Sequence, residues 1–117
     1  QRYGAAPHAI DVVWVPGAWE IPVAAQAIAA RGRHHGIVAL GALVRGETAH
    51  FDVLARAVAD RLATIAVETG VPVGFGVLTA YTMEQAMERA AADGGNKGWE
   101  AAQAAIEMAD LLASLRD

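Results

Sequence analysis

Apolar residues are gathered in three short runs along the chain, each followed by turn-forming or polar residues. The runs are rich in aliphatic and β-branched side chains and have the length of strands. We therefore predict three β-strands, at Ala9–Val15, Gly36–Val44 and Val71–Leu78. Pro16 and Gly17 stop the first of them. The unbroken apolar character of the second is typical of a strand covered on both faces.

The segments that follow these runs predict helices. Their ranges are Ile21–Ala30, Phe51–Thr69, Thr82 to about Ala92, and Trp99–Leu115. Pro22 suits a first helical turn, where a missing N–H costs nothing, while Gly32 and Gly70 are expected to end helices. Thr82 and Gln85 fit a capping box, in which the two side chains satisfy backbone N–H groups reciprocally.

The order β-α-β-α-β-α-α predicts one α/β domain: a three-layer α/β/α arrangement around a parallel sheet with right-handed crossovers. Functional sites in such sheets lie at the carboxyl ends of the strands. We therefore expect the site to be built from the segments that follow those ends, namely Pro16–Glu20, Arg45–His50 and Thr79–Thr82.

Composition narrows the classes of protein. Of the 117 residues 55% are apolar and 19% charged, which is typical of a folded domain, and no apolar stretch approaches the ~20 residues of a membrane helix. Gln1–Ile10 lacks the apolar core of a signal peptide. The absence of cysteine excludes disulfides, thiolate metal sites and cysteine nucleophiles. A net charge of −4 without a basic stripe argues against nucleic-acid binding, so we expect a small, soluble, cytoplasmic protein.

Arg45–His50 is the segment with the clearest potential chemistry. It precedes a predicted helix, whose N-terminal N–H groups and dipole favour an anion. Thr48 would add a hydroxyl donor, although a simple helix cap explains it equally well. The imidazole of His50 suits proton transfer near neutrality, and the alternative is a loop histidine without a role.

Four other charged residues have both a functional and a structural explanation. Arg89 and Lys97 have the charge to bind phosphate, but lone surface cations are more common. Glu20 and Glu100 begin helices, where each would accept hydrogen bonds from a polyol, orient a histidine, or interact only with the helix dipole. The glycines around Lys97 lack the spacing of a P-loop, and no dinucleotide fingerprint is present.

Two aromatic residues and a histidine pair complete the candidates. Trp19 and Phe75 would stack on a planar ring, although core packing is the commoner use of such side chains. The adjacent His34 and His35 have no third ligand nearby in the sequence, so metal binding is weakly supported.

Five blocks of the sequence, taken together, resemble lumazine synthases. They are Val15–Pro22 (VPGAWEIP), Gly41–Asp52 (GALVRGETAHFD), Gly74–Thr79 (GFGVLT), Glu84–Ala90 (EQAMERA) and Gly95–Ala102 (GNKGWEAA). The blocks occur in the order and with spacings similar to those of the family, over nearly the whole chain. The resemblance implies a flavodoxin-like fold plan.

The resemblance also implies an activity. Lumazine synthases condense 5-amino-6-(D-ribitylamino)uracil with 3,4-dihydroxy-2-butanone 4-phosphate to 6,7-dimethyl-8-ribityllumazine, with loss of phosphate and water. This is the penultimate step of riboflavin biosynthesis and uses no cofactor and no catalytic metal. Family members are pentamers or 60-subunit shells of pentamers, with active sites between subunits.

Site residues follow by the same resemblance. The implied substrate-binding residues are Ala18, Trp19 and Glu20 for the ribityl chain, Glu47 and Thr48 for the phosphate, and Gly74, Phe75 and Gly76 for the pyrimidine. His50 matches the proton-transfer histidine of the family. Arg89 matches the arginine that an adjacent subunit supplies to the phosphate, and Lys97 and Glu100 match assisting positions near His50.

The chain also departs from the family pattern. Family members have a further strand and helix ahead of Ala9–Val15, and that strand is interior to the sheet and carries an aromatic that stacks on the pyrimidine. Gln1–Tyr3 resembles the tail of that helix. Neighbouring strands need ladder partners, so we expect the native protein to have a few dozen more residues at its N-terminus.

Two other classes of protein compete with the enzyme. A shell-forming or flavin-binding relative without turnover is one, but the presence of His50, Thr48, Arg89 and Lys97 argues against it. A nucleotide-binding or signalling module on a flavodoxin-like plan is the other, and it requires a phosphate loop or an acidic phosphoacceptor pocket after the first strand. The segment that follows Val15 provides neither.

Overall fold

A parallel two-stranded sheet organises the structure, a computed structural model that describes residues 9–44, 50–80, 83–90 and 97–116. The strands are β1 (Ile37–Val44) and β2 (Val73–Ala80). They pair in register from Ile37 opposite Val73 to Val44 opposite Ala80. The second and third of the three predicted strands therefore form, with β2 beginning two residues later than expected.

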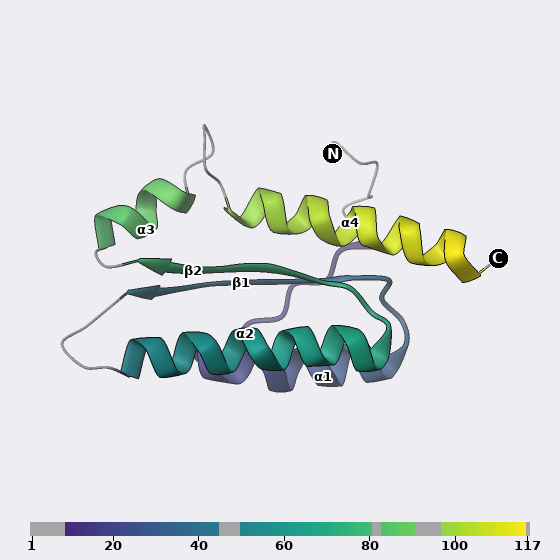
Figure 1. The fold of residues 1–117 in the computed structure, drawn as a ribbon, viewed down its shortest axis with the longest axis horizontal. Helices are drawn as coiled ribbons and strands as arrows, with labels where there is room; N and C mark the ends of the chain where they lie inside the picture. Colours follow the sequence, from purple (N-terminus) through teal and green to yellow (C-terminus); the bar gives the residue numbers. More distant parts are fainter. Residues whose placement is uncertain (1–8, 45–49, 81–82, 91–96, 117) are drawn as a thin grey trace.

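Helices cover both faces of this sheet (Figure 1). Helices α1 (Ile21–Arg31) and α2 (His50–Thr69) lie on one face, and α3 (Met83–Ala90) and α4 (Lys97–Arg116) lie on the other. This arrangement confirms the predicted three-layer α/β/α fold with a parallel sheet. Within the described ranges, no helix combines the length and apolar character that crossing a membrane requires.

Glycines end α1 and α2 as the sequence predicts. Gly32 and Gly70 have φ angles of 70° and 74°, in the left-handed region that residues with a Cβ rarely adopt. Their N–H groups donate to the carbonyls of Ala29 (3.2 Å) and Ala66 (3.0 Å), which satisfies part of the last helical turn. Pro22 lies in the first turn of α1, where it removes no helical hydrogen bond.

The main core lies between the sheet and the layer of α1 and α2. Val58, Leu62 and Ile65 of α2 are at most 2% exposed and share one helical face. The same cluster includes residues of α1 and of both strands, namely Ile21, Ala25, Ala29, Ala39 and Val77. Because three of these five are alanines, α1 packs closely on the sheet, and the burial of their apolar area stabilises the layer.

The prediction of a strand at Ala9–Val15 is wrong for the described structure. The segment is not part of the sheet, and it runs past the strands from the α4 side to the α1 side (Figure 1). Val12 and Trp14 are 70% and 89% exposed. A strand requires a hydrogen-bonded neighbour, and among the described residues this apolar segment has none. Its contact with the rest of the fold includes a hydrogen bond between His34 Nε2 and Asp11 Oδ2 at 2.7 Å.

Candidate functional site

The carboxyl ends of both strands lie at one edge of the sheet, where the arrowheads point in Figure 1. A short 3-10 turn, η2 (Ala18–Glu20), contacts both β1 and α2. A Cβ on Gly41 would lie 3.4 Å from Ile21 Cδ1, so the start of α1 sits over the second half of β1. Because η2 immediately precedes Ile21, the structure brings η2 to the edge at which the sequence predicts the site.

The three residues of η2 differ in how far their side chains are buried. The N–H of Glu20 donates to the carbonyl of Gly17 at 3.1 Å and closes the turn. Ala18 packs against the core, whereas Trp19 is 63% exposed. Glu20 Oε1 would lie only 3.3 Å from a Cβ on Gly17, so the carboxylate folds back over that glycine. A half-buried carboxylate is thereby held near the strand ends.

Two of the predicted residues form an ion pair in the first turn of α4. Lys97 Nζ lies 3.3 Å from Glu100 Oε2, and both side chains are about half exposed. The next residue, Ala101, packs over Gly74 and Gly76 of β2, so the pair lies on the face of the sheet opposite η2. Lys97 and Glu100 thus form an ion pair with each other, and the sheet separates both from Glu20. The functional roles of Lys97 and Glu100 stay predictions.

The Gly74–Phe75–Gly76 block lies near the beginning of β2 rather than at its carboxyl end. Gly74 and Gly76 are buried beneath α4, which accounts for both glycines without any ligand. Phe75 alternates to the other face of the strand and is 46% exposed. It precedes Ala80 by five positions, about 17 Å along a strand. A single chain therefore does not bring Phe75 to the strand-end edge.

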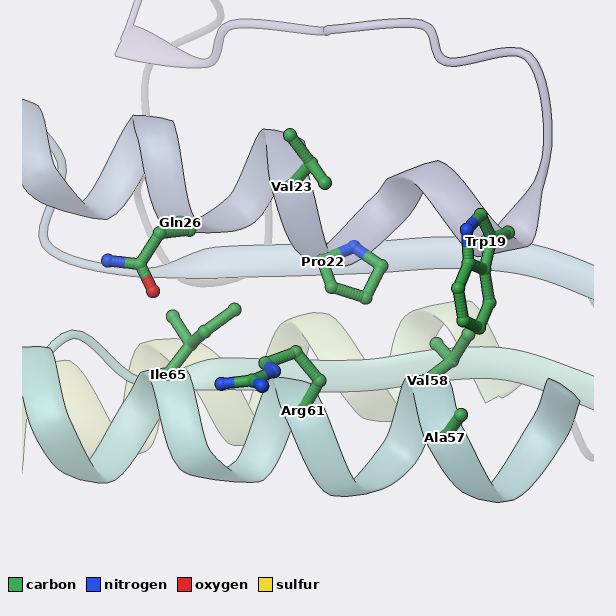
Figure 2. A pocket seen from close by; sticks show the side chains of 8 residues that line it. All are labelled: Trp19, Pro22, Val23, Gln26, Ala57, Val58, Arg61 and Ile65. Carbon is green, nitrogen blue, oxygen red and sulfur yellow. The ribbon is translucent and has the colours of Figure 1, made fainter. Parts of the chain in front are cut away.

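Several predicted site residues lack a described side chain. Glu47, Thr48 and the capping residue Thr82 lie outside the described residues. His50 is the first residue of α2, and Arg89 is next to the last residue of α3. His50 begins α2, and η2 contacts the same helix further along, where Trp19 lies near Ala57 and Val58 (Figure 2). The proposed roles of all five residues stay predictions.

A groove between α1 and α2 is a feature that the sequence interpretation missed (Figure 2). It has a volume of about 550 Å³ and is lined by Trp19, Pro22, Val23, Gln26, Ala57, Val58, Arg61 and Ile65. The lining residues repeat at intervals of three and four along each helix. Residues spaced in this way lie on one face of a helix, so the spacing indicates in the sequence that the two helices share a surface.

The His34–His35 pair is not part of a metal cluster in the described structure. Where side chains are described, no group of three histidine, aspartate or glutamate residues is placed to hold a metal ion. His34 instead contacts Asp11 through Nε2, while its Nδ1 is buried without a hydrogen-bond partner in the described residues. His34 thereby ties the N-terminal segment to the loop between α1 and β1.

Comparison with known proteins decides the family. The sequence profile described as 6,7-dimethyl-8-ribityllumazine synthase matches residues 1–113. The chain belongs to this family. The protein named 6,7-dimethyl-8-ribityllumazine synthase in Kosmotoga olearia is 51% identical over 111 residues, which cover 95% of this chain and 71% of that relative. The resemblance inferred from the five sequence blocks is confirmed, and the family is one of transferase enzymes.

Proposed function

We propose that this protein condenses 5-amino-6-(D-ribitylamino)uracil with 3,4-dihydroxy-2-butanone 4-phosphate to give 6,7-dimethyl-8-ribityllumazine, phosphate and water. The observation that carries the proposal is the family match over residues 1–113, and the 51% identity to the Kosmotoga olearia relative supports it. The reaction is the penultimate step of riboflavin biosynthesis. A phosphate ester does not cross membranes freely, which favours a cytoplasmic location.

The chemistry requires charge stabilisation and several proton transfers. The amine of the uracil substrate attacks the ketone, and loss of water gives an imine. The C–O bond to phosphate then breaks, and the ribityl-bearing nitrogen closes the ring onto the remaining carbonyl carbon with loss of a second water. Each step moves protons, so one group with a pKa near neutrality serves as both acid and base. Positioning of the two substrates removes the entropic cost of a bimolecular encounter.

The phosphate is proposed to bind at the beginning of α2. This helix has 20 residues and starts at His50, directly after the carboxyl end of β1 and the Glu47–Thr48 segment. Its unpaired N-terminal N–H groups and dipole favour an anion. Arg89 would add a charge-assisted hydrogen bond to the leaving phosphate, and His50 would transfer the protons.

The ribityl chain is proposed to lie along η2. Glu20 holds a carboxylate near the strand ends, and a carboxylate accepts hydrogen bonds from hydroxyl groups. Lys97 and Glu100 are proposed as assisting residues. Their mutual ion pair at 3.3 Å supports a role in which Glu100 positions the ammonium group of Lys97.

We propose that the active sites lie between subunits of a pentamer or of a 60-subunit shell of pentamers. The position of Phe75 supports this, because it is 46% exposed and lies about 17 Å from the strand ends of its own chain. A neighbouring copy is the simplest source of a phenyl ring for the pyrimidine pocket. The exposed Trp19 and Met87 are further apolar side chains that a subunit contact would cover.

The test is lumazine formation followed by absorbance, with both substrates and protein from the complete reading frame. We expect product from the native protein and a large loss in Arg89→Ala. Arg116→Ala is the matched control, because Arg116 ends α4 on an exposed turn and has no assigned role. Absence of product from a folded, assembled native protein would contradict the proposal and favour a non-catalytic shell or flavin-binding relative.

A further inference from the structure

We propose that Gly17 is a positioning residue for the carboxylate of Glu20. The absence of a side chain on Gly17 leaves the space over which that carboxylate folds. The inference rests on the proposed function and deepens it, because Glu20 is the residue proposed to accept hydrogen bonds from the ribityl chain. Three observations carry it: the backbone conformation of Gly17, the space beside it, and the anchoring of the chain on either side.

The backbone conformation of Gly17 does not require a glycine. Its φ and ψ angles are −164° and 177°, in the extended region that any residue adopts. Gly17 differs in this from Gly32 and Gly70, whose positive φ angles favour glycine. Backbone strain therefore gives no reason for a glycine at this position, and an alanine is expected to be compatible with the fold.

The space beside Gly17 is occupied by the carboxylate of Glu20. A Cβ on Gly17 would lie 3.3 Å from Glu20 Oε1, which is tighter than an ordinary van der Waals contact. The N–H of Glu20 also donates to the carbonyl of Gly17 at 3.1 Å, so the main chains of the two residues are fixed relative to each other. A methyl group on Gly17 would therefore press directly on the carboxylate.

The chain around Gly17 is anchored, so the backbone does not move aside easily. Val15 and Ala18, on either side of Gly17, both pack against the main core. Pro16 further restricts the backbone between them. The carboxylate of Glu20 would have to give way instead, by a few tenths of an ångström. A displacement of this size matters, because a binding site must hold its polar groups to within about 0.5 Å of the productive geometry.

The test is a calorimetric titration of the assembled native protein and Gly17→Ala with 5-amino-6-(D-ribitylamino)uracil alone. We expect roughly three- to tenfold weaker binding by the variant, because hydrogen bonds to a charged acceptor are weakened. The urea midpoint is expected to stay the same or rise, since alanine loses less conformational entropy on folding than glycine. Gly36→Ala is the matched control, because its Cβ would make an ordinary contact of 3.6 Å to the Ala105 carbonyl oxygen.

A double-mutant cycle with Glu20→Ala distinguishes positioning of the carboxylate from a general structural effect. Gly17→Ala is expected to weaken binding in the native background but to have no further effect in Glu20→Ala, which has no carboxylate to displace. In turnover, the KM for the uracil substrate should rise in Gly17→Ala while kcat stays unchanged, because the ribityl chain is remote from the bonds that form and break.

Two results would overturn this inference alone: equal binding by the native protein and Gly17→Ala, or the same loss of binding from Gly17→Ala with and without the Glu20 carboxylate. Absence of saturable binding by the native protein would overturn it together with the proposed ribityl site. Binding that depends on Gly17 through Glu20, but without lumazine formation, would support this inference while contradicting the proposed reaction.

Discussion

Gly74 on β2 lies directly against the main chain of Ala101 on α4. A Cβ on Gly74 would lie 2.8 Å from the carbonyl carbon of Ala101, and closer still to its carbonyl oxygen. No side chain fits in that space, so α4 rests on the backbone of the strand. This contact holds the first turns of α4, which include Lys97 and Glu100, close against the sheet.

Gly74→Ala is expected to lower the free energy of unfolding by about 1–3 kcal/mol, because main-chain atoms must separate to admit the methyl group. Urea denaturation at a fixed protein concentration measures the change. Gly36→Ala is the control: its Cβ would lie 3.6 Å from the Ala105 carbonyl oxygen, an ordinary contact. Equal stability of the two variants would show that α4 does not approach β2 this closely.

Leu62→Ala is expected to cost about 2–5 kcal/mol of stability, because it removes apolar atoms from the core and leaves a cavity. Leu62 is 2% exposed between α2 and the sheet. Val67→Ala on the same helix is expected to change stability by less than about 0.5 kcal/mol, since Val67 is 84% exposed. A similar loss in both variants would contradict the assignment of the buried face of α2.

Gly32→Ala is expected to lower stability by about 1–2 kcal/mol, because the left-handed conformation at φ 70° is unfavourable for a residue with a Cβ. Space is not the cause, since a Cβ there would meet no atom within 4 Å. Gly32→Asn should recover part of the loss, because asparagine adopts this conformation more readily. Thermal or urea unfolding of the native protein and the two variants measures these stabilities. An equal loss of stability in both variants would argue against a backbone cause.

His50→Ala is expected to reduce the rate of lumazine formation by roughly 10²–10⁴-fold, the usual contribution of an acid–base group. Turnover should remain measurable, because positioning of the two substrates does not depend on the imidazole. The measurement is kcat and KM in the assembled variant. His35→Ala, which removes an exposed histidine after α1, serves as the control. Complete loss of turnover in folded His50→Ala would contradict the expectation that substrate positioning sustains a slower reaction without the imidazole.

The Lys97–Glu100 pair is expected to contribute only about 0.2–1 kcal/mol to stability, because both side chains are roughly half exposed and water screens the charges. A double-mutant cycle with Lys97→Gln and Glu100→Gln measures the coupling. Turnover of the same variants tests the assisting role. A loss of activity in Lys97→Gln without a change in stability would support that role, whereas unchanged turnover would remove Lys97 from the site.

Much of the fold could be predicted from local features of the sequence. Gly32 and Gly70 end helices because a left-handed residue favours glycine wherever the chain goes next. The alternation of strands and helices likewise predicts a parallel sheet, since only a crossover connects parallel neighbours. For the site, five sequence blocks were sufficient to indicate the family, and η2 contacts both β1 and α2, as expected of a segment near the strand ends.

Other features could not be predicted from local pattern. Ala9–Val15 has the composition of a strand, but pairing depends on a neighbour that composition does not supply. Phe75 adjoins two glycines in the sequence, but that α4 packs on the glycine face of β2, and leaves the face of Phe75 free of it, follows only from the packing of the layers. The groove near Arg61 exists only because α1 and α2 lie side by side.

The sequence by itself thus determined the ends of α1 and α2, the order of the elements from α1 onward, the parallel sheet and the family, because each of these follows from a residue and its near neighbours. The tertiary structure decided which apolar segments are buried, which face Phe75 occupies, that Lys97 lies across the sheet from Glu20, and that a groove opens beside Trp19. The physical reason is that burial and proximity depend on residues far apart in the chain, whose approach is settled only when the layers pack.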